Sequence, residues 1–259
     1  MQSFWTAAPL IVFLAGCSSS EPVDPEKPLD SPVWDGKVQQ WGTLREVMHG
    51  EVMDGQVRLS EVTDKPHVFG IGASDKLQGE VLIADSVAWV VKAQDGDRIE
   101  TRQSDSPKDS AAFLAVSQVT EWTETSVDQD VSAEEFDDFI QKTISQAGLD
   151  ELETVPFMIE GRFPNVELHV LKGQCPFAEV KVEIEGAGPP YRTMLNDVQG
   201  LLVGFYSDTG AGRITHHWTR THVHALVGPS VKRVAGHVDA VALKAGTIIR
   251  LPTHRSGPG

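Results

Sequence analysis

Apolar and polar residues alternate along much of this chain, and the alternation predicts β-strands. The segment 179–185 reads EVKVEIE, in which every second side chain is apolar, as on a strand with one buried face. Two apolar runs within 80–91 are separated by Asp85-Ser86, a pattern typical of a hairpin. Further strands are predicted at 57–59, 113–124, 156–170, 200–206, 222–226, 237–243 and 247–251, and 69–72 is a segment punctuated by glycines.

Helical spacing is clearest after Ser132. Phe136, Ile140 and Ile144 fall on one face of a helix, and Gly148 is a natural end. Ser132 and Glu135 have the spacing of a capping box, so the helix is expected to begin at Ser132. A shorter helix is predicted within 42–50.

Many strands and few helices predict a β-rich α+β fold. The helix at 132–147 is expected to divide the folded part into two subdomains. These are an N-terminal α/β subdomain at 33–150 and a C-terminal, β-rich, metal-binding subdomain at 151–259.

The first residues indicate a targeting signal. Residues 4–16 read FWTAAPLIVFLAG, which is too short to span a bilayer as a helix but suits the apolar region of a signal peptide. The run ends in Leu14-Ala15-Gly16-Cys17, which looks like a bacterial lipobox. Because Met1-Gln2-Ser3 contains no lysine or arginine, a plain secretory signal and an N-terminal anchor stay open as alternatives.

The lipobox interpretation predicts a signal peptide at 1–17 that is cut before Cys17, and a lipid attached to this cysteine. Residues 18–32, SSSEPVDPEKPLDSP, are too polar to bury a core and are expected to form a flexible tether. The expected location is outside the cytoplasm, in the periplasm or at the cell surface, with an N-terminal lipid as the only contact with the membrane.

Charge and cysteine content narrow the classes of partner. The chain has 37 acidic and 22 basic residues and a net charge of -15, so it repels phosphate backbones and no nucleic-acid partner is expected. Its two cysteines, Cys17 and Cys175, lie in different contexts and do not indicate a disulfide. For Cys175, a buried inert thiol is favoured over a reactive one.

Histidines form the candidate chemistry. His222 and His224 are two residues apart in a predicted strand, so both side chains point to one face. His237, in the next predicted strand, can join them, and three neutral histidines with an open position are typical of catalytic zinc. Nitrogen ligands also suit other divalent metals, and a His-x-His pair alone is common on wet strand faces. His216 and His217 are adjacent and would point to opposite faces of a strand, so at most one could join the same site, and by default both are expected at the surface.

Several short motifs carry a resemblance to a known family. Gln40-Trp41-Gly42-Thr43-Leu44 and Gly55-Gln56-Val57 come first, followed by Phe69-Gly70-Ile71-Gly72, Leu77-Gln78-Gly79-Glu80, the strand 200–206, His222-Val223-His224 and Gly236-His237-Val238. Their identity and order resemble the acetolactate decarboxylase family from about residue 38 to residue 252.

The resemblance implies two α/β domains, each centred on a β-sheet, and a possible homodimer. It implies that His222, His224 and His237 bind Zn²⁺. The implied reaction removes carbon dioxide from 2-acetolactate, a small 2-hydroxy-3-oxo acid, and gives (R)-acetoin. Zinc would stabilise the enediolate that remains, and Glu80 matches the glutamate that protonates it.

Three positions depart from the family pattern. His169 takes the place of an active-site arginine, which would bind a carboxylate through two bonds. The segment after Leu251-Pro252 lacks the family's carboxylate side chain, and the spacing from His224 to His237 is slightly longer. The expected function is therefore acetolactate decarboxylation, possibly weakened. The alternative is a catalytically altered or inactive zinc-binding lipoprotein of this fold, which acts on or binds another small hydroxy-keto acid.

Overall fold

The computed structural model describes residues 34–94, 98–176 and 186–254, all within the compact unit formed by residues 32–259. Cys17, the tether and the strand predicted at 179–185 lie outside the described residues. Among the described residues, no helix has the length and apolar character needed to cross a membrane.

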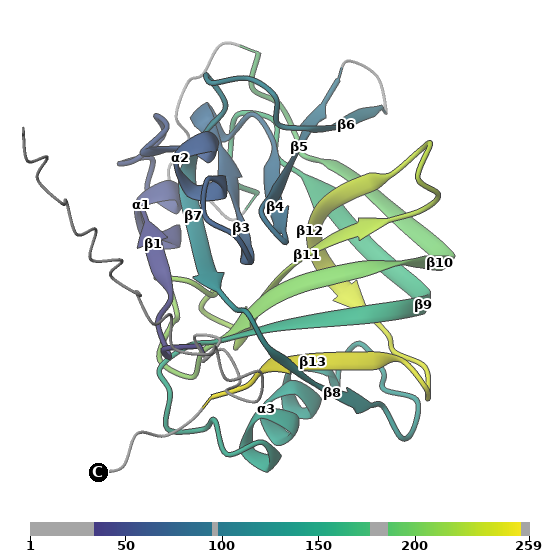
Figure 1. The fold of residues 1–259 in the computed structure, drawn as a ribbon. Helices are drawn as coiled ribbons and strands as arrows, with labels where there is room; N and C mark the ends of the chain where they lie inside the picture. Colours follow the sequence, from purple (N-terminus) through teal and green to yellow (C-terminus); the bar gives the residue numbers. More distant parts are fainter. Residues whose placement is uncertain (1–33, 95–97, 177–185, 255–259) are drawn as a thin grey trace, which may run out of the picture. The chain divides into compact units, whose positions relative to one another are not determined.

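An antiparallel sheet is built from the first half of the chain (Figure 1). Its strand order is β1-β7-β3-β4-β5-β6, and β2 also pairs with β7. The strands are β1 (Gln39–Trp41), β2 (Val57–Arg58), β3 (Val68–Ser74), β4 (Glu80–Ala84), β5 (Val87–Ala93), β6 (Ile99–Gln103) and β7 (Ser110–Gln118). The short helices are α1 (Leu44–Met48), α2 (Leu59–Thr63) and the 3-10 turn η1 (Asp75–Leu77).

A second antiparallel sheet follows, with the order β10-β11-β12-β9-β13-β8. Its elements are β8 (Trp122–Ser126), helix α3 (Phe136–Gln146), β9 (Val155–Val170), β10 (Tyr191–Tyr206), β11 (Thr221–Val227), β12 (Val234–Val241) and β13 (Ile248–Pro252). Because β9 pairs with β10 along one edge and with β12 and β13 on the other, strands β9 to β12 close into a ring (Figure 1).

The predicted β-rich α+β class is confirmed, and so is the hairpin within 80–91. Strands β4 and β5 pair directly, and the turn residues Asp85 and Ser86 have φ values of 46° and 65°. Positive φ at both central residues is the geometry of a two-residue turn that matches the twist of paired strands.

The long helix begins four residues later than predicted. Helix α3 starts at Phe136, and residues 133–135 form a turn before it. Only one half of the capping box is present: the backbone N–H of Ser132 donates to the carboxylate of Glu135 at 3.2 Å. Gly148, with φ of 68°, follows the end of the helix as expected.

The change from one sheet to the other falls between β7 and β8. The single strand predicted at 113–124 is therefore wrong, because its two halves belong to different sheets. Strand β8 pairs with β13, so the second sheet takes a strand from before helix α3. The division into subdomains at residue 150 stays a prediction.

Apolar side chains form three packed layers. One cluster draws residues from both sheets and includes Phe113 and Phe205. A second packs the outer face of the second sheet against α3, and a third covers the outer face of the first sheet beside α2. In β11, Val223 and Ala225 belong to the α3 layer, so their neighbours His222 and His224 face the layer between the sheets.

Candidate functional site

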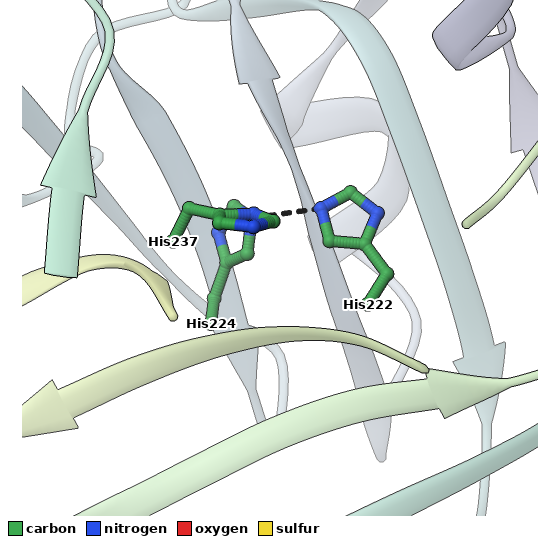
Figure 2. A group of neighbouring side chains, drawn as sticks. All are labelled: His222, His224 and His237. Carbon is green, nitrogen blue, oxygen red and sulfur yellow. Dashed lines mark hydrogen bonds between the residues drawn. The ribbon is translucent and has the colours of Figure 1, made fainter. Parts of the chain in front are cut away.

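Three histidines converge on one point between the sheets (Figure 2). His222 and His224 project from β11, and His237 on β12 lies directly opposite His224 in the register. All three are buried, and each offers a ring nitrogen within 4.8 Å of the others. The Nε2 atoms of His222 and His224 are 3.3 Å apart.

These distances fit a tetrahedral metal ion. Zinc–nitrogen bonds of about 2.0–2.1 Å at the tetrahedral angle separate two ligand nitrogens by about 3.3–3.4 Å. The Nδ1–H of His222 donates to the carbonyl oxygen of Ile214 at 2.8 Å, which leaves Nε2 with a lone pair toward the cluster. The donor set and its supporting hydrogen bond therefore suit a divalent ion.

Burial keeps the three histidines uncharged. Loss of solvent is the main cause that lowers the pKa of His224 to about 3, and it lowers the pKa of His222 and of His237 well below the ordinary value. The neighbouring imidazoles lower these pKa values further. A neutral imidazole is the form that binds a metal, so no proton has to be displaced at neutral pH.

Glu80, the first residue of β4, lies beside the cluster. The backbone N–H of Leu171 donates to its Oε1 at 3.1 Å, and its Oε2 is 3.9 Å from Nε2 of His224. Burial raises the pKa of Glu80 to about 8, with a small addition from the charge of Asp239, against the opposing effect of the Leu171 hydrogen bond. Since both partners are neutral at pH 7, the contact with His224 is not an ion pair.

The residue before Glu80 has to be glycine. A Cβ on Gly79 would lie 1.9 Å from the carbonyl oxygen of Val91 on β5, and the φ of Gly79 is 155°. Only glycine allows the chain to pass this close to its neighbour. The Gly-Glu pair read from the sequence thus has a structural reason: Gly79 lets β4 begin with Glu80 against β5 and facing the histidines.

His169 also reaches the site. It lies on β9 opposite His237, and their ring centroids are 4.5 Å apart. Its Nδ1 is 2.7 Å from Oδ1 of Asp239, and the guanidinium of Arg192 donates to Oδ2 of Asp239 at 2.6 Å. His169 takes the place of the arginine in the family pattern. Its buried imidazole contacts the carboxylate of Asp239, and this carboxylate in turn contacts the more exposed guanidinium of Arg192.

Sequence reasoning missed Asp239 and Arg192. Asp239 sits at a β-bulge in β12, where the register with β9 shifts between Val238 and Ala240. A bulge changes the direction of a side chain, so strand periodicity alone does not place this carboxylate. Arg192 is the cross-strand partner of His169, and that pairing became visible only with the register of β10.

The prediction that His216 lies at the surface is wrong. Its side chain is buried, and its ring centroid is 5.7 Å from that of His222 and 5.5 Å from that of His237. Burial is the main cause that lowers the pKa of His216 to about 4. His216 lies in the connection between β10 and β11, where no periodicity indicates which side chains point inward. His217 is exposed, as expected.

A family model for alpha-acetolactate decarboxylase matches residues 38–255. The chain belongs to this family. The acetolactate decarboxylase match covers both sheets and every candidate residue described above. A comparison with curated protein sequences gives no match.

Solved structures confirm the acetolactate decarboxylase fold. The enzyme from Bacillus subtilis strain 168 superposes with a TM-score of 0.62 at 20% identity, covering 83% of this chain and 86% of that one. The enzyme from Bacillus subtilis subspecies spizizenii gives 0.62 at 21% identity, with 84% and 86% covered. A Staphylococcus aureus protein of unknown function, similar to the same enzyme, gives 0.59 at 17% identity, with 83% and 84% covered.

A small cavity touches the histidine cluster and Glu80. Its volume is about 30 Å³, and Phe113, Leu171 and Cys175 contribute to its walls. The ring of Phe113 stacks on His222 with centroids 5.6 Å apart and planes 10° apart. Cys175 is buried, as the sequence predicted. An apolar, water-poor surrounding of this kind strengthens electrostatic interactions at the cluster.

The C-terminal departure from acetolactate decarboxylases is visible in the structure. After Pro252 the chain runs past Trp34, and Nδ1 of His254 lies 3.1 Å from the carbonyl oxygen of Trp34. Neither Thr253 nor His254 carries a carboxylate side chain. The described part of this segment therefore brings no carboxylate to the histidine cluster.

Proposed function

We propose that this chain removes carbon dioxide from 2-acetolactate and releases (R)-acetoin, with zinc as its metal. The observation that carries the proposal is the place of the buried Glu80 carboxyl, whose Oε2 lies 3.9 Å from Nε2 of His224, beside the three neutral histidines. Burial raises the pKa of a carboxyl toward neutral pH, which suits a general acid. Family membership supports a small-molecule substrate and a carboxy-lyase reaction.

His222, His224 and His237 would hold the ion. When bound, zinc would act as a Lewis acid that stabilises the negative charge left as carbon dioxide departs. The cation would also lower the pKa of Glu80 from its value in the metal-free protein. The fold contributes ligands on paired strands, whose positions are fixed before the ion arrives.

Glu80 supplies the proton that replaces the lost carboxyl group. The Leu171 hydrogen bond fixes Oε1, so the proton is held on Oε2, the oxygen nearer the cluster. Protonation from one fixed side gives one stereoisomer of the product. The carboxylate that remains then takes a proton from water before the next turnover.

His169 orients the substrate carboxylate. Asp239 accepts a hydrogen bond from Nδ1 of His169 and fixes the orientation of the ring, and an imidazole with hydrogen on both nitrogens has one further N–H, on Nε2, to donate to an anion. This is one bond, where the planar guanidinium of arginine would give two. Arg192 in turn fixes Asp239. Substrate anchoring is therefore weaker in this chain than with an arginine at position 169.

The test is acetoin formation from racemic acetolactate by zinc-loaded residues 33–259. Glu80→Gln is the matched variant: it keeps the shape of the side chain and removes the proton. It should bind zinc normally and lose about 10²- to 10⁴-fold in rate, the usual contribution of a general acid. A zinc-loaded wild type that forms no acetoin above the uncatalysed rate would contradict the proposal.

A second function follows from the altered anchor. If one histidine cannot hold acetolactate productively, the same site becomes a zinc-binding site for another small hydroxy-keto acid. This alternative predicts stoichiometric zinc and binding of such acids, measured by calorimetry, together with no acetoin production.

The proposed location is outside the cytoplasm, with a lipid on Cys17 as the anchor. In a bacterial host the full-length chain should partition with detergent, and Cys17→Ser should abolish this. A lipid would explain how a chain with a net charge of -15 remains at an anionic membrane surface that repels it. If both versions stay in the aqueous phase without lipid, the anchor is ruled out.

A further inference from the structure

Strands β11 and β12 separate just beyond the candidate metal ligands. Their pairing runs from Val227↔Val234 to His224↔His237 and ends there. Strand β12 then turns to pair with β9, while β11 continues back to Thr221. The gap between them is bounded on the far side by the start of α3 and contains a pocket of about 240 Å³.

This pocket is larger than the small cavity at the cluster. The small cavity, at about 30 Å³, has room for about one water-sized ligand, because one water molecule takes about 30 Å³ of liquid volume. 2-Acetolactate is several times larger than water and cannot enter that cavity as it stands. The larger pocket can hold a molecule of this size.

His216 and His237 are the two side chains that line both spaces. His237 lies on a strand that is paired on both edges, and a bound metal would fix it further. His216 lies in the connection between β10 and β11, outside regular structure. Of the two, His216 is therefore the side chain that can move to join the spaces.

Trp218 forms the outer side of this wall. Its ring stacks on His216, with centroids 5.7 Å apart and planes 13° apart. The side of Trp218 away from His216 is open to solvent, since the residue is 63% exposed. Two stacked rings thus lie between the solvent and the histidine cluster at the mouth of the pocket.

We propose that the pocket between β11 and β12 binds the substrate and leads it to the metal, and that His216, backed by Trp218, is the side chain it displaces. This inference rests on the proposed function for the identity of the substrate. It assigns to His216 a positioning role that neither the sequence motifs nor the three metal ligands supply.

The charge of the pocket narrows the class of ligand. Glu134, Asp137 and Asp239 line it, and none of its lining residues in the described part of the chain is lysine or arginine. Repulsion by these carboxylates grows with the negative charge of the ligand. The pocket therefore favours a neutral hydroxy-ketone or a singly charged hydroxy-keto acid over a doubly charged acid.

The test measures how fast a chelator removes zinc from the loaded protein. His216→Ala opens the wall and should speed removal several-fold. Ala133→Trp fills the pocket from the side of α3, away from the histidines, and should slow removal several-fold. His217→Ala, at an exposed neighbouring position, is the matched control and should change nothing. Circular dichroism checks folding, and Ala133→Leu is a milder filling variant if tryptophan disrupts the fold.

Unchanged rates in both His216→Ala and Ala133→Trp would overturn the proposal, because zinc would then be reached by another path. This readout is independent of decarboxylation. Absence of acetoin together with the expected chelator rates would refute the proposed function and support the pocket. Acetoin formation with an unchanged KM in Ala133→Trp would support the proposed function and refute the pocket as the substrate site.

The charge of the ligand is tested by protection. Singly charged 2-hydroxyisobutyrate should slow zinc removal at several-fold lower concentration than doubly charged citramalate. Equal protection by the two acids would overturn the charge preference. Loss of the hydroxyisobutyrate effect in Ala133→Trp would place the acid in this pocket.

Discussion

Burial beside other imidazoles determines the chemistry of single residues at the site. His222, His224 and His237 have lowered pKa values because solvent is excluded and because a positive charge on one would repel the others. Three nitrogen lone pairs are thereby brought together in a buried site from which solvent is excluded. A divalent cation is the partner that satisfies all three at once.

The double substitution His222→Ala, His224→Ala should abolish metal binding. Two of three nitrogen ligands are lost, and one histidine alone does not hold a divalent ion at ordinary concentrations. Metal analysis should find about one zinc per wild-type chain and none above background in the variant. His67→Ala, which removes an exposed histidine in the turn before β3, is the control and should keep its zinc. Equal zinc in the double variant and the wild type would rule out this cluster as the metal site.

His169→Arg should restore the second bond to the substrate carboxylate. A charge-assisted hydrogen bond is worth about 1.5–3 kcal/mol, which corresponds to about ten- to a hundred-fold in kcat/KM. Steady-state acetoin formation is the measurement, with most of the gain expected in KM. Asp239→Asn should have the opposite effect, since it removes the carboxylate that holds Nδ1 of His169. A loss of activity in His169→Arg would show that the imidazole itself is required.

At the level of elements, the carboxylate of Asp137 joins helix α3 to the start of β11. Asp137 accepts hydrogen bonds from the backbone N–H of Arg220 at 2.7 Å and from the hydroxyl of Thr221 at 2.5 Å. Arg220 and Thr221 lie two residues and one residue before His222, the first of the three candidate ligands along the chain. The position of β11, and with it the ligand pair, thus depends on this contact.

Asp137→Ala should lower the free energy of unfolding by about 1–3 kcal/mol, the cost of leaving buried donors without an acceptor. Chemical denaturation measures this. Asp138→Ala is the matched control: Asp138 also contacts Arg220, but its side chain is 81% exposed, and such surface pairs are worth about 0–1 kcal/mol. Equal effects of the two substitutions would show that the contact of Asp137 with β11 adds nothing specific.

Elements with a regular pattern were predictable from sequence, and those that depend on distant partners were not. The alternation at β11 placed His222 and His224 on one face, and Asp85-Ser86 marked a turn. The same reasoning merged β7 and β8, because both are apolar and only their pairing partners differ. His216 and Asp239 were missed for a related reason: a connection without periodicity positions one and a bulge the other. The position of His237 in the next predicted strand linked it to the pair, whereas only the family motifs linked Glu80 to them.

For the molecule as a whole, two opposed titrations shape the pH dependence of the stability of the metal-free protein. Histidines with lowered pKa bind fewer protons when folded than when unfolded, so stability falls as pH drops below about 6.5. Glu80 has a raised pKa and binds more protons when folded, so its effect lowers stability as pH rises from about 4.5 to about 8. Below pH 6.5 the histidines outnumber Glu80 and determine how stability changes with pH. Above pH 6.5 the histidines no longer titrate, and Glu80 determines the change.

Stability without metal should therefore be highest near pH 6.5. The alkaline loss between pH 6.5 and 8 should be about 2 kcal/mol, at about 1.4 kcal/mol for each pH unit over which Glu80 would otherwise be ionised. Urea unfolding of the metal-free protein from pH 4.5 to 8 gives the profile. Glu80→Gln should lose the alkaline limb and keep the acid limb. An unchanged alkaline limb in this variant would assign it to another group.

Strand β9 has a position that matters for how the chain reaches this fold. It contributes one edge to β10 and the other to β12 and β13, and β13 contains the last residues of the second sheet. The partner strands β8 and β9 are made before β13, so a growing chain on the ribosome exposes their unpaired edges until the residues of β13 emerge. Unpaired edges recruit other chains. Synthesis that stops before residue 248 would thus leave β8 without its partner, and such truncated chains would collect as aggregates or be removed by proteases.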